Sequence, residues 1–469
     1  MNPPRSARHR LGGSAIPSLA VLEPATEAVL AEIPRAGVEE ADAAVARANA
    51  AYPAWRAVSP PDRAKLLHGL ADALVDRQEE LAVLEARNAG KPIGDARGEM
   101  GMVVDTFRFY AGAVERTLGD TIPVAGGVAM TFREPLGVVA LITPWNFPLT
   151  IASWKLAPCL AAGNTVVLKP AELTPLTALE FERIALAAGI PEGVVNVVAG
   201  PGSTCGARLV EHPDVAKVAF TGSTEVGRTI AAGAAQTIKR VTLELGGKSP
   251  NLVFADADVE AAAAAAPSAV FGNAGQDCCA RSRILVQESV LDDFLAALSA
   301  VVAGIRVGDP LDEETQMGPL ISAQQRETVG SYVPDGAPVA ARGDAPGGPG
   351  FWFPPTVLAP VDPGDRAARE EIFGPVACVM PFRDEDEAIA LANDTIYGLS
   401  GSIWTRDGAR ALRVARAVEA GVLSINSNTS VRVSTPFGGF KQSGVGRELG
   451  PHALDHYTEV KSVYYATGG

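Results

Sequence analysis

The sequence predicts an α/β protein whose strands form parallel sheets covered by helices on both faces. Apolar runs typical of buried strands occur at Val138–Ile142, Thr165–Leu168, Val194–Val198, Val215–Phe220 and Val241–Leu245. Helical stretches lie between several of them, at Leu149–Ala162, Pro175–Ala188 and Cys205–Glu211. Strands that are apolar throughout and are joined by helices are typical of a sheet buried on both faces. Such a sheet binds ligands beyond the carboxyl ends of its strands.

The segment before the first strand predicts a hairpin and three helices. Residues 20–34 alternate like a hairpin, with Pro24 and Ala25 at its turn. The expected helices are Val38–Trp55, a helix that Ser59 caps and that runs to about Asn88, and Asp95–Leu118. Residues 119–136, centred on Gly126-Gly127, predict an exposed hairpin whose edges seek a partner.

A second α/β run begins near Asn251. An alanine-rich helix starts at about Val259, and the run continues through Arg283–Val286, Val290–Ile305, Ala377–Pro381, Glu385–Ala392 and Leu423–Asn426. The stretch Pro334–Pro355 is expected as a surface excursion, and Glu459–Ala466 as a terminal strand. A chain of 469 residues is too long for one hydrophobic core, so we expect two or three domains.

The composition excludes several classes of protein. With 47% apolar and 20% charged residues the chain is globular, and its net charge of −14 argues against nucleic acid or anionic membrane as a partner. No window is apolar enough for a membrane span. Residues 1–13 lack the apolar core of a secretory signal; we expect a disordered tail, with a transit peptide as the alternative. The five cysteines show no paired spacing, which indicates reduced thiols in the cytoplasm.

The stretch Phe271–Ala280 carries the candidate nucleophile. Cys278 and Cys279 follow a glycine turn, and glycine lets backbone come close beside a reactive thiol. The alternative is a small buried apolar residue. No histidine lies near in sequence, so a Cys–His pair would have to be assembled by the fold, and no metal motif is present.

Four further stretches follow predicted strands. Asn146 follows a proline-bounded turn and is either an oxyanion donor or a turn residue. Lys169 and Glu172 could reach ribose hydroxyls or could be surface charges. Ser223 begins a helix after a glycine turn and offers a pyrophosphate site, although the usual dinucleotide glycine fingerprint is absent. Glu244, flanked by leucines, is either a desolvated general base or the partner of Lys248.

In this order and at these spacings, the motifs resemble those of the aldehyde dehydrogenase superfamily from about Val21 to Tyr465. The motifs that carry the resemblance are Leu243–Lys248, Gly275–Cys278, Glu370–Pro375 and Pro436–Gly444. The resemblance implies an NAD+-dependent oxidation of an aldehyde to a carboxylic acid. Cys278 would form the hemithioacetal and thioester, Asn146 and the Cys278 N–H would hold the oxyanion, and Glu244 would activate the hydrolytic water. Lys155 and Glu448 match a proton-relay pair of some relatives, with a plain salt bridge as the alternative.

The resemblance also implies a cofactor site. Lys169 and Glu172 match adenosine-ribose contacts, Ser223 a pyrophosphate contact, and Glu371 and Phe373 contacts of the nicotinamide end. The remaining implied cofactor contacts are Ile142, Thr143, Pro144, Trp145, Pro170, Ala171, Gly202, Phe220, Thr221, Gly222, Leu245 and Gly246. Because the Glu172 carboxylate would repel a 2′-phosphate, NAD+ is favoured, with NADP+ as the alternative.

The implied substrate pocket is mostly apolar and aromatic. Its residues are Phe147, Thr150, Ile151, Trp154, Asp277, Cys279, Val431 and Phe437. Asp277 is unusual there, and we hypothesise that it favours amino- or betaine-type aldehydes, with Trp154 as a cation–π face. Alternatively, Asp277 pairs with Arg281 or Arg432, and Arg432 could itself indicate an acidic semialdehyde.

The resemblance implies three parts of the chain. They are an NAD-binding domain of variant Rossmann type (1–118 and 137–245), a catalytic domain (246–447) and a small β oligomerisation element (119–136 and 448–469) of a homodimer or homotetramer. The rival activities are a CoA-acylating semialdehyde dehydrogenase and an acyl-phosphate reductase, against which Glu244 argues. A non-catalytic protein on this fold is the third rival, and the intact Cys278, Glu244 and Asn146 argue against it.

Overall fold

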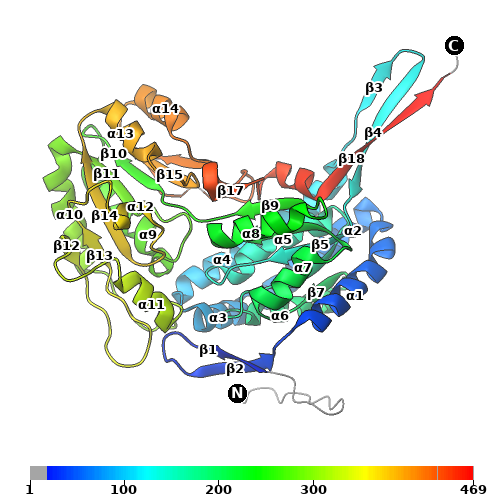
Figure 1. Ribbon diagram of the computed structural model, residues 1–469, viewed down its shortest axis with the longest axis horizontal. Helices are drawn as coiled ribbons and strands as arrows, with labels where there is room; N and C mark the ends of the chain where they lie inside the picture. The colour runs from blue at the N-terminus through cyan, green and yellow to red at the C-terminus, as the bar shows by residue number, and fades with distance from the viewer. Residues whose placement is uncertain (1–17, 430, 468–469) are drawn as a thin grey trace.

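The computed structural model describes residues 18–429 and 431–467 (Figure 1). The tail predicted at residues 1–13 lies outside the described residues. The described residues begin with strand β1 (Ser18–Leu22). In the described part of the chain, every helix is too short or too polar to cross a bilayer.

The first sheet has the strand order β17-β9-β8-β5-β6-β7 among the described residues. Its strands are β5 (Val138–Ile142), β6 (Thr165–Lys169), β7 (Val195–Val197), β8 (Val215–Thr221), β9 (Arg240–Glu244) and β17 (Gly444–Val445). Neighbouring strands are parallel, except that β17 runs antiparallel to β9. The register places Ile142 beside Lys169 and Phe220, and Thr221 beside Glu244. The carboxyl ends of these strands therefore meet at one edge.

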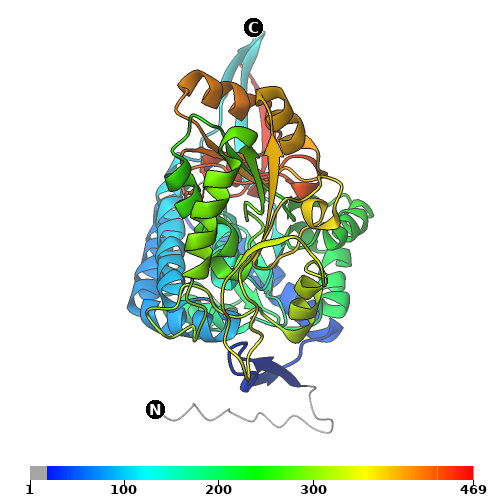
Figure 2. The ribbon, with the colours of Figure 1, turned by 90° about the vertical axis from the view of Figure 1, so that its left-hand side faces the viewer.

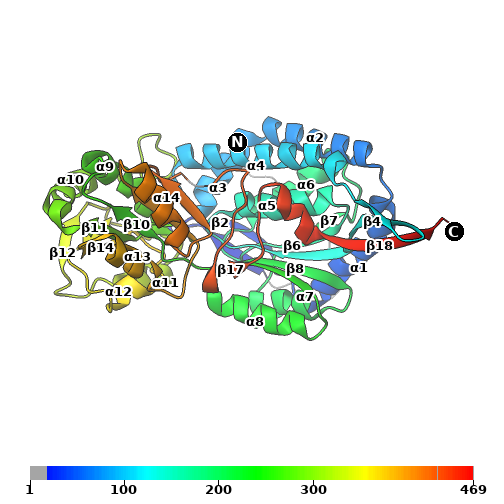
Figure 3. The same cartoon turned by 90° about the horizontal axis from the view of Figure 1, so that it is seen from above.

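Helices cover both faces of the first sheet (Figure 3). Val139 and Leu141 pack into one cluster of buried residues, whereas their neighbours Val138 and Ala140 pack into another. The first cluster includes residues of α2 (Pro60–Asp76), α3 (Gln78–Ala89), α4 (Ile93–Ala113), α5 (Pro148–Ala161) and α6 (Leu176–Ala187). The second includes residues of α1 (Val38–Arg56), α7 (Ala207–Glu211) and α8 (Thr224–Ala235). The predicted parallel sheet buried on both faces is confirmed.

The second sheet has the strand order β12-β13-β14-β11-β10-β15-β16 among the described residues. It lies beside the first sheet in Figure 1 and in front of it in Figure 2. Its strands are β10 (Pro250–Val253), β11 (Arg283–Gln287), β12 (Val339–Arg342), β13 (Thr356–Leu358), β14 (Val376–Phe382), β15 (Ser400–Trp404) and β16 (Val422–Ile425). Its helices are α9 (Val259–Phe271), α10 (Leu291–Ala303), α11 (Ala323–Gly330), α12 (Arg366–Arg369), α13 (Glu385–Asn393) and α14 (Gly408–Ala417). Neighbouring strands are parallel, except that β12 runs antiparallel to β13.

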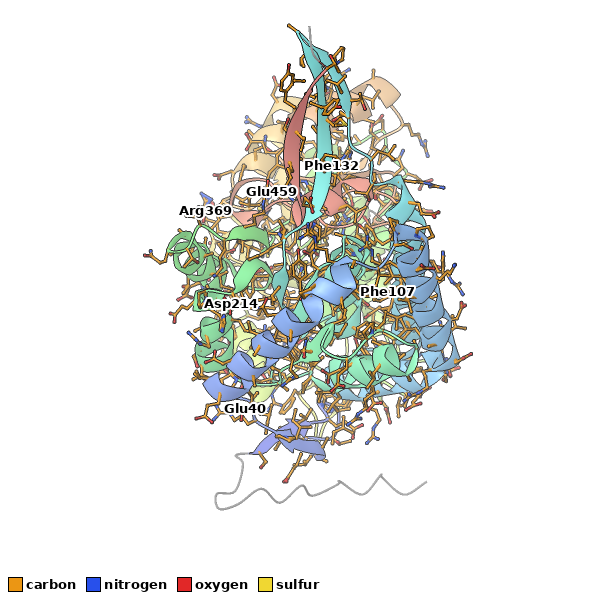
Figure 4. The ribbon with its side chains drawn as sticks, turned by 90° about the vertical axis from the view of Figure 1, so that its right-hand side faces the viewer. Glu40, Phe107, Phe132, Asp214, Arg369 and Glu459 are labelled. Atoms are coloured by element: carbon orange, nitrogen blue, oxygen red, sulfur yellow. The ribbon has the colours of Figure 1, made fainter. Side chains whose placement is uncertain are left out.

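A three-stranded antiparallel arm projects from the body in the described part of the chain (Figure 1). It consists of β3 (Thr121–Val124), β4 (Gly127–Pro135) and β18 (Thr458–Ala466), so both predicted exposed elements exist and pair with each other. Phe132 and Glu459 lie on it (Figure 4), and Phe132 and Tyr465 are exposed. The N-terminal hairpin of β1 and β2 (Val29–Pro34) lies elsewhere on the body. Short helical turns complete the fold: η1 (Val114–Arg116), η2 (Gly202–Gly206), η3 (Gly272–Gly275), η4 (Glu288–Val290), η5 (Lys441–Ser443) and η6 (Pro451–Tyr457).

Several predicted elements differ from the structure. The single helix expected from Ser59 to Asn88 is two helices, because Arg77 leaves the helical conformation (φ −109°, ψ 7°) and binds Glu80 with its guanidinium. The helix expected to reach Leu118 ends at Ala113. The excursion at 334–355 contains strand β12. The predicted domain boundaries stay a prediction; β17, at residues 444–445, joins the first sheet.

Candidate active site

A cavity of ≈ 340 Å³ lies at the carboxyl ends of β8 and β9, where Thr221 and Glu244 line it. Cys278 and Glu448 also line it. All eight predicted pocket residues contribute to its wall: Phe147, Thr150, Ile151, Trp154, Asp277, Cys279, Val431 and Phe437. The fold thus brings side chains from distant parts of the sequence to one cavity. In the described part of the chain, no histidine lines this cavity, so no Cys–His pair forms there.

Cys278 lies in the loop between η3 and β11, beside a second thiol and a carboxylate. The Asp277 carboxylate and the sulfur atoms of Cys278 and Cys279 all lie within 4.8 Å of one another. A hydrogen bond with Cys279, burial and the negative charge of Asp277 raise the pKa of the Cys278 thiol. The resting thiol is therefore protonated at neutral pH and has to lose its proton when it attacks. The prediction that the site holds no metal stays a prediction.

Glu244 ends β9 with a carboxylate that is only 3% exposed. In the described residues neither of its oxygens has a hydrogen-bond partner, and the amine of Lys248 has none either. The predicted alternative, a Glu244–Lys248 ion pair, is therefore wrong. Burial, followed by the charge of Glu448, raises the pKa of Glu244 well above its usual value. A buried carboxylate at the cavity wall, with both oxygens free of hydrogen bonds, can take a proton from a water molecule.

Lys155 and Glu448 form a buried ion pair next to Glu244. The Lys155 amine binds a carboxylate oxygen of Glu448 and donates to the Thr221 hydroxyl at 2.7 Å. Their side chains are 0% and 2% exposed. Backbone hydrogen bonds of 2.7 Å in both directions join Glu448 to Phe437 of the cavity wall. The salt bridge expected as one alternative exists; a role in proton relay stays a prediction.

Asn146 does not line the cavity, but it is bonded to the loop that carries Cys278. Its side-chain nitrogen donates to the Gln276 carbonyl at 2.8 Å, and the Asn273 side chain donates to the Asn146 carbonyl at 2.9 Å. The backbone N–H of Cys278 has no acceptor among the described residues. The Asn146 amide keeps a second N–H that this bond does not use.

Asp277 accepts the backbone N–H of Cys279 at 2.8 Å. The guanidinium of Arg281 donates to the Cys279 carbonyl at 2.9 Å and to the Ser402 hydroxyl at 3.3 Å, and Arg432 donates to the Thr429 carbonyl. None of these bonds reaches Asp277. Burial raises the pKa of Asp277, while its bond with Cys279 and the charge of Arg281 lower it.

The residues implied as cofactor contacts gather at the carboxyl edge of the first sheet. Lys169 ends β6 and donates to the Pro170 carbonyl at 2.8 Å, and Ser223 caps α8 by accepting the Val226 N–H at 3.3 Å. The first N–H groups of a helix have no partner within it, so the start of α8 can bind an anion. Trp145 packs edge-on against Phe373, with ring centroids 5.1 Å apart.

Glu371 lies between α12 and β14 and accepts the Gly247 N–H at 2.9 Å. Burial raises the pKa of Glu371 to about 7. A Cβ added at Gly246 would lie 2.3 Å from the Glu371 carboxylate, so a larger residue there would displace this side chain. The free N–H groups at the start of α8 suit a pyrophosphate, and the Glu371 carboxylate suits a ribose hydroxyl. Together they suit a dinucleotide.

Several cavity residues are not predicted by the sequence motifs. They are Glu99, Met102, Ser268, Ala269, Arg281, Leu399, Asn428 and Thr429, and Thr221 and Leu245, expected as cofactor contacts, also line the cavity. Glu99 lies on α4, whose sequence pattern gives no sign that this residue faces a cavity. Arg281 was considered only as a partner of Asp277.

Comparisons with known proteins agree with this geometry. A family model described as "Aldehyde dehydrogenase family" matches residues 13–463. Betaine aldehyde dehydrogenase 1 of Rhizobium meliloti is 46% identical over 454 residues, 95% of this chain and 93% of that protein. Phenylacetaldehyde dehydrogenase of Pseudomonas fluorescens is 45% identical over 465 residues, 96% of this chain and 93% of that protein. The NAD+ complex of an aldehyde dehydrogenase from Bacillus cereus has a TM-score of 0.94 at 43% identity, covering 96% of this chain and 94% of that one.

Replacement of Lys155 by methionine is expected to destabilise the protein by about 3–5 kcal/mol, because it leaves the buried Glu448 without its cation. Chemical unfolding followed by fluorescence measures this change. The double variant Lys155→Met with Glu448→Leu should recover much of the loss. Arg240→Met, which breaks the exposed pair with Glu459, is the matched control and should change stability little. A Lys155→Met loss no larger than that of the control would contradict the pairing.

Proposed function

Because the chain belongs to the aldehyde dehydrogenase family, we propose that it oxidises an aldehyde with NAD+ through a thioester on Cys278 that Glu244-activated water hydrolyses. The resemblance inferred from the motifs and the α/β fold class are thereby confirmed, and the protein is an oxidoreductase that acts on aldehydes. The course of the reaction and the substrate are the proposal. The observation that carries it is the shared cavity of Cys278 and of Glu244 with its two unbonded oxygens.

The first step is attack on the aldehyde carbon by the Cys278 sulfur, whose proton passes to solvent as the C–S bond forms. The carbonyl electron pair moves to oxygen, and the free N–H of Asn146 and the backbone N–H of Cys278 stabilise that charge. Loss of hydride from the same carbon leaves a thioester. Glu244 then takes a proton from water, and the hydroxide attacks the thioester carbon. The C–S bond breaks, the carboxylic acid leaves, and the Cys278 sulfur receives the proton from Glu244.

NAD+ is the proposed cofactor, and when bound it accepts the hydride. Ser223 and the start of α8 would hold its pyrophosphate, Lys169 and Glu172 its adenosine ribose, and Glu371 and Phe373 its nicotinamide end. The Bacillus cereus structure named above contains NAD+. The Glu172 carboxylate disfavours a 2′-phosphate, so we propose preference for NAD+ over NADP+.

The proposed substrate is an amino- or betaine-type aldehyde. The carboxylate of Asp277 lies in the cavity wall beside Cys278, and Trp154 and Phe437 supply aromatic faces with ring centroids 5.1 Å apart. A carboxylate and aromatic faces together attract a cationic group. The names of two relatives, betaine aldehyde and phenylacetaldehyde dehydrogenase, mark a cationic and an aromatic alternative.

A homo-oligomer assembled through the arm is a further part of the proposal. Ile122, Phe132, Val460 and Tyr464 expose apolar surface on strands that lie outside the body. Burying such surface between copies removes it from water and protects the strand edges. All five cysteines are free thiols, which fits the proposed cytoplasmic location.

Glu244→Gln is expected to release about one NADH per site in a rapid first turnover and then to slow at least about 100-fold. The variant can still form the thioester but cannot activate water. In the unsubstituted enzyme, the steady-state rate should fall as pH falls through the raised pKa of Glu244, because the protonated acid cannot accept a proton. Stopped-flow absorbance of NADH, with and without CoA, measures both phases. An unchanged steady-state rate in the variant, or a rate that requires CoA, would contradict hydrolysis by Glu244.

Cys278→Ala is expected to abolish NADH formation, whereas Cys279→Ala should keep most of it, since only Cys278 carries the acyl group. The two variants remove neighbouring thiols, so each is a control for the effect of the other on packing. Steady-state rates with one aldehyde decide the assignment. An active Cys278→Ala variant beside an inactive Cys279→Ala variant would overturn it.

Asp277→Asn is expected to lower kcat/KM for a trimethylammonio-aldehyde about tenfold more than for an uncharged aldehyde of equal length, because it removes the charge that attracts the cation. A panel of amino-, betaine-, semi- and aliphatic aldehydes provides the measurement. Equal losses for all members would exclude this role of Asp277, and the highest kcat/KM for a semialdehyde would favour an acidic substrate.

A further inference from the structure

Helix α5, which begins two residues after Asn146, lacks a capping group of its own. Its N-cap is Phe147, whose side chain makes no cap hydrogen bond, and Pro148 has no N–H to offer. Leu149 therefore carries the first N–H of the helix, and a carboxylate oxygen of Glu85 on α3 accepts it at 3.1 Å. The other oxygen of Glu85 accepts the Thr177 hydroxyl at 2.8 Å. Glu85 caps α5 from a different helix.

Two more charged residues contact the same turn of α5. The Lys91 amine binds both carboxylate oxygens of Glu99, at 2.7 and 2.5 Å, and lies 4.5 Å from the centre of the Phe147 ring. Glu99 in turn accepts the Thr150 hydroxyl at 3.3 Å. The start of α5 is thus held at Phe147, at the Leu149 N–H and at Thr150.

The three charged residues around the start of α5 lie in the interior and not at the surface. Glu85 is 0% and Lys91 1% exposed, and the Glu99 side chain is 13% exposed. Burial raises the pKa of Glu85, and it raises the pKa of Glu99 to about 7 although Lys91 opposes this. A buried charge is costly unless it is paired. The carboxylate of Glu85 lies at the N-terminus of α5, whose positive end stabilises a negative charge.

We propose that Glu85, Lys91 and Glu99 are positioning residues that fix the start of α5 and thereby the place of Asn146 and of the cavity wall at Phe147. Only Phe147 and Pro148 separate Asn146 from Leu149, and proline allows little rotation there. Asn146 is bonded at its other side to Gln276 of the nucleophile loop. A shift of α5 therefore moves the oxyanion donor relative to Cys278. The inference rests on the proposed role of Asn146.

The test compares Glu85→Leu with Glu85→Gln. Leucine removes the acceptor of the Leu149 N–H, whereas glutamine keeps an acceptor of the same length. We expect Glu85→Leu to slow the first-turnover NADH burst about tenfold, since a small displacement of an oxyanion donor costs one to two orders of magnitude. Glu85→Gln should restore most of the rate, and the NAD+ dissociation constant should stay within about twofold in both.

Glu182→Leu is the matched control. Glu182 on α6 also accepts a backbone N–H from another element, that of Val197 at 2.8 Å. Among the described residues no hydrogen bond or ion pair joins it to α5, and it does not line the cavity. Its burst rate should equal that of the unsubstituted enzyme. A loss in Glu182→Leu as large as in Glu85→Leu would show a general effect on the domain and would overturn the proposal.

Lys91→Met gives a second test that does not depend on the folding of Glu85→Leu. It removes the cation over Phe147, so we expect a slower burst and a higher aldehyde KM with unchanged NAD+ binding. If both variants fold, an unchanged burst rate in Lys91→Met and in Glu85→Leu overturns the proposal. If Glu85→Leu does not fold, an unchanged burst rate in Lys91→Met overturns it. Asn146→Ala separates the two levels: if it leaves the burst unchanged, the role of Asn146 fails; if it slows the burst while the positioning variants do not, only the present inference fails.

Discussion

The site depends on the close contact between the chain that leaves β9 and the loop that carries the nucleophile. A Cβ at Gly247 would lie 2.2 Å from the Cys278 carbonyl oxygen, so any other residue would push the loop away. A second close approach occurs at Gly438, with φ 153°, where a Cβ would lie 2.7 Å from a carboxylate oxygen of Glu244. These contacts place the end of β9 against the loop of Cys278 and the segment of Gly438, so that Glu244 and Cys278 line one cavity.

That arrangement places an unpaired carboxylate in the interior. Among the described residues no hydrogen bond stabilises the charge of Glu244, and burial raises its pKa, which makes it a better proton acceptor. The same burial would be unfavourable for folding alone, as is often found where a group is held for chemistry. Next to it, Lys155 neutralises Glu448, so only one of the two carboxylates is paired. The charged residues around the start of α5 extend this pattern of buried ionisable groups, and one of them, Glu99, also lines the cavity.

The sequence predicts most of the fold because its central strands are long and apolar, as in Val138–Ile142 and Val215–Thr221. It does not predict β15, which contains a glycine and two serines in five residues, or β12, an edge strand inside a segment rich in glycine and proline. The predicted pocket residues all line the cavity. They could be predicted because they lie in or near the sequence motifs that resemble those of the family. Glu99 and Glu85 carry no motif, and their contacts with α5 arise only from the packing of helices far apart in sequence. The bond of Asn146 to Gln276, likewise, depends on the fold and not on the motif.

The central claim is that the acyl group is held on Cys278 until Glu244 activates water. It is tested most directly by quenching the Glu244→Gln variant after one turnover with NAD+ and an aldehyde, and by locating the added mass through peptide fragmentation. The account predicts an acyl adduct on Cys278 that depends on NAD+ and is absent from Cys279. An adduct on Cys279, or no adduct after NADH has formed, would contradict it.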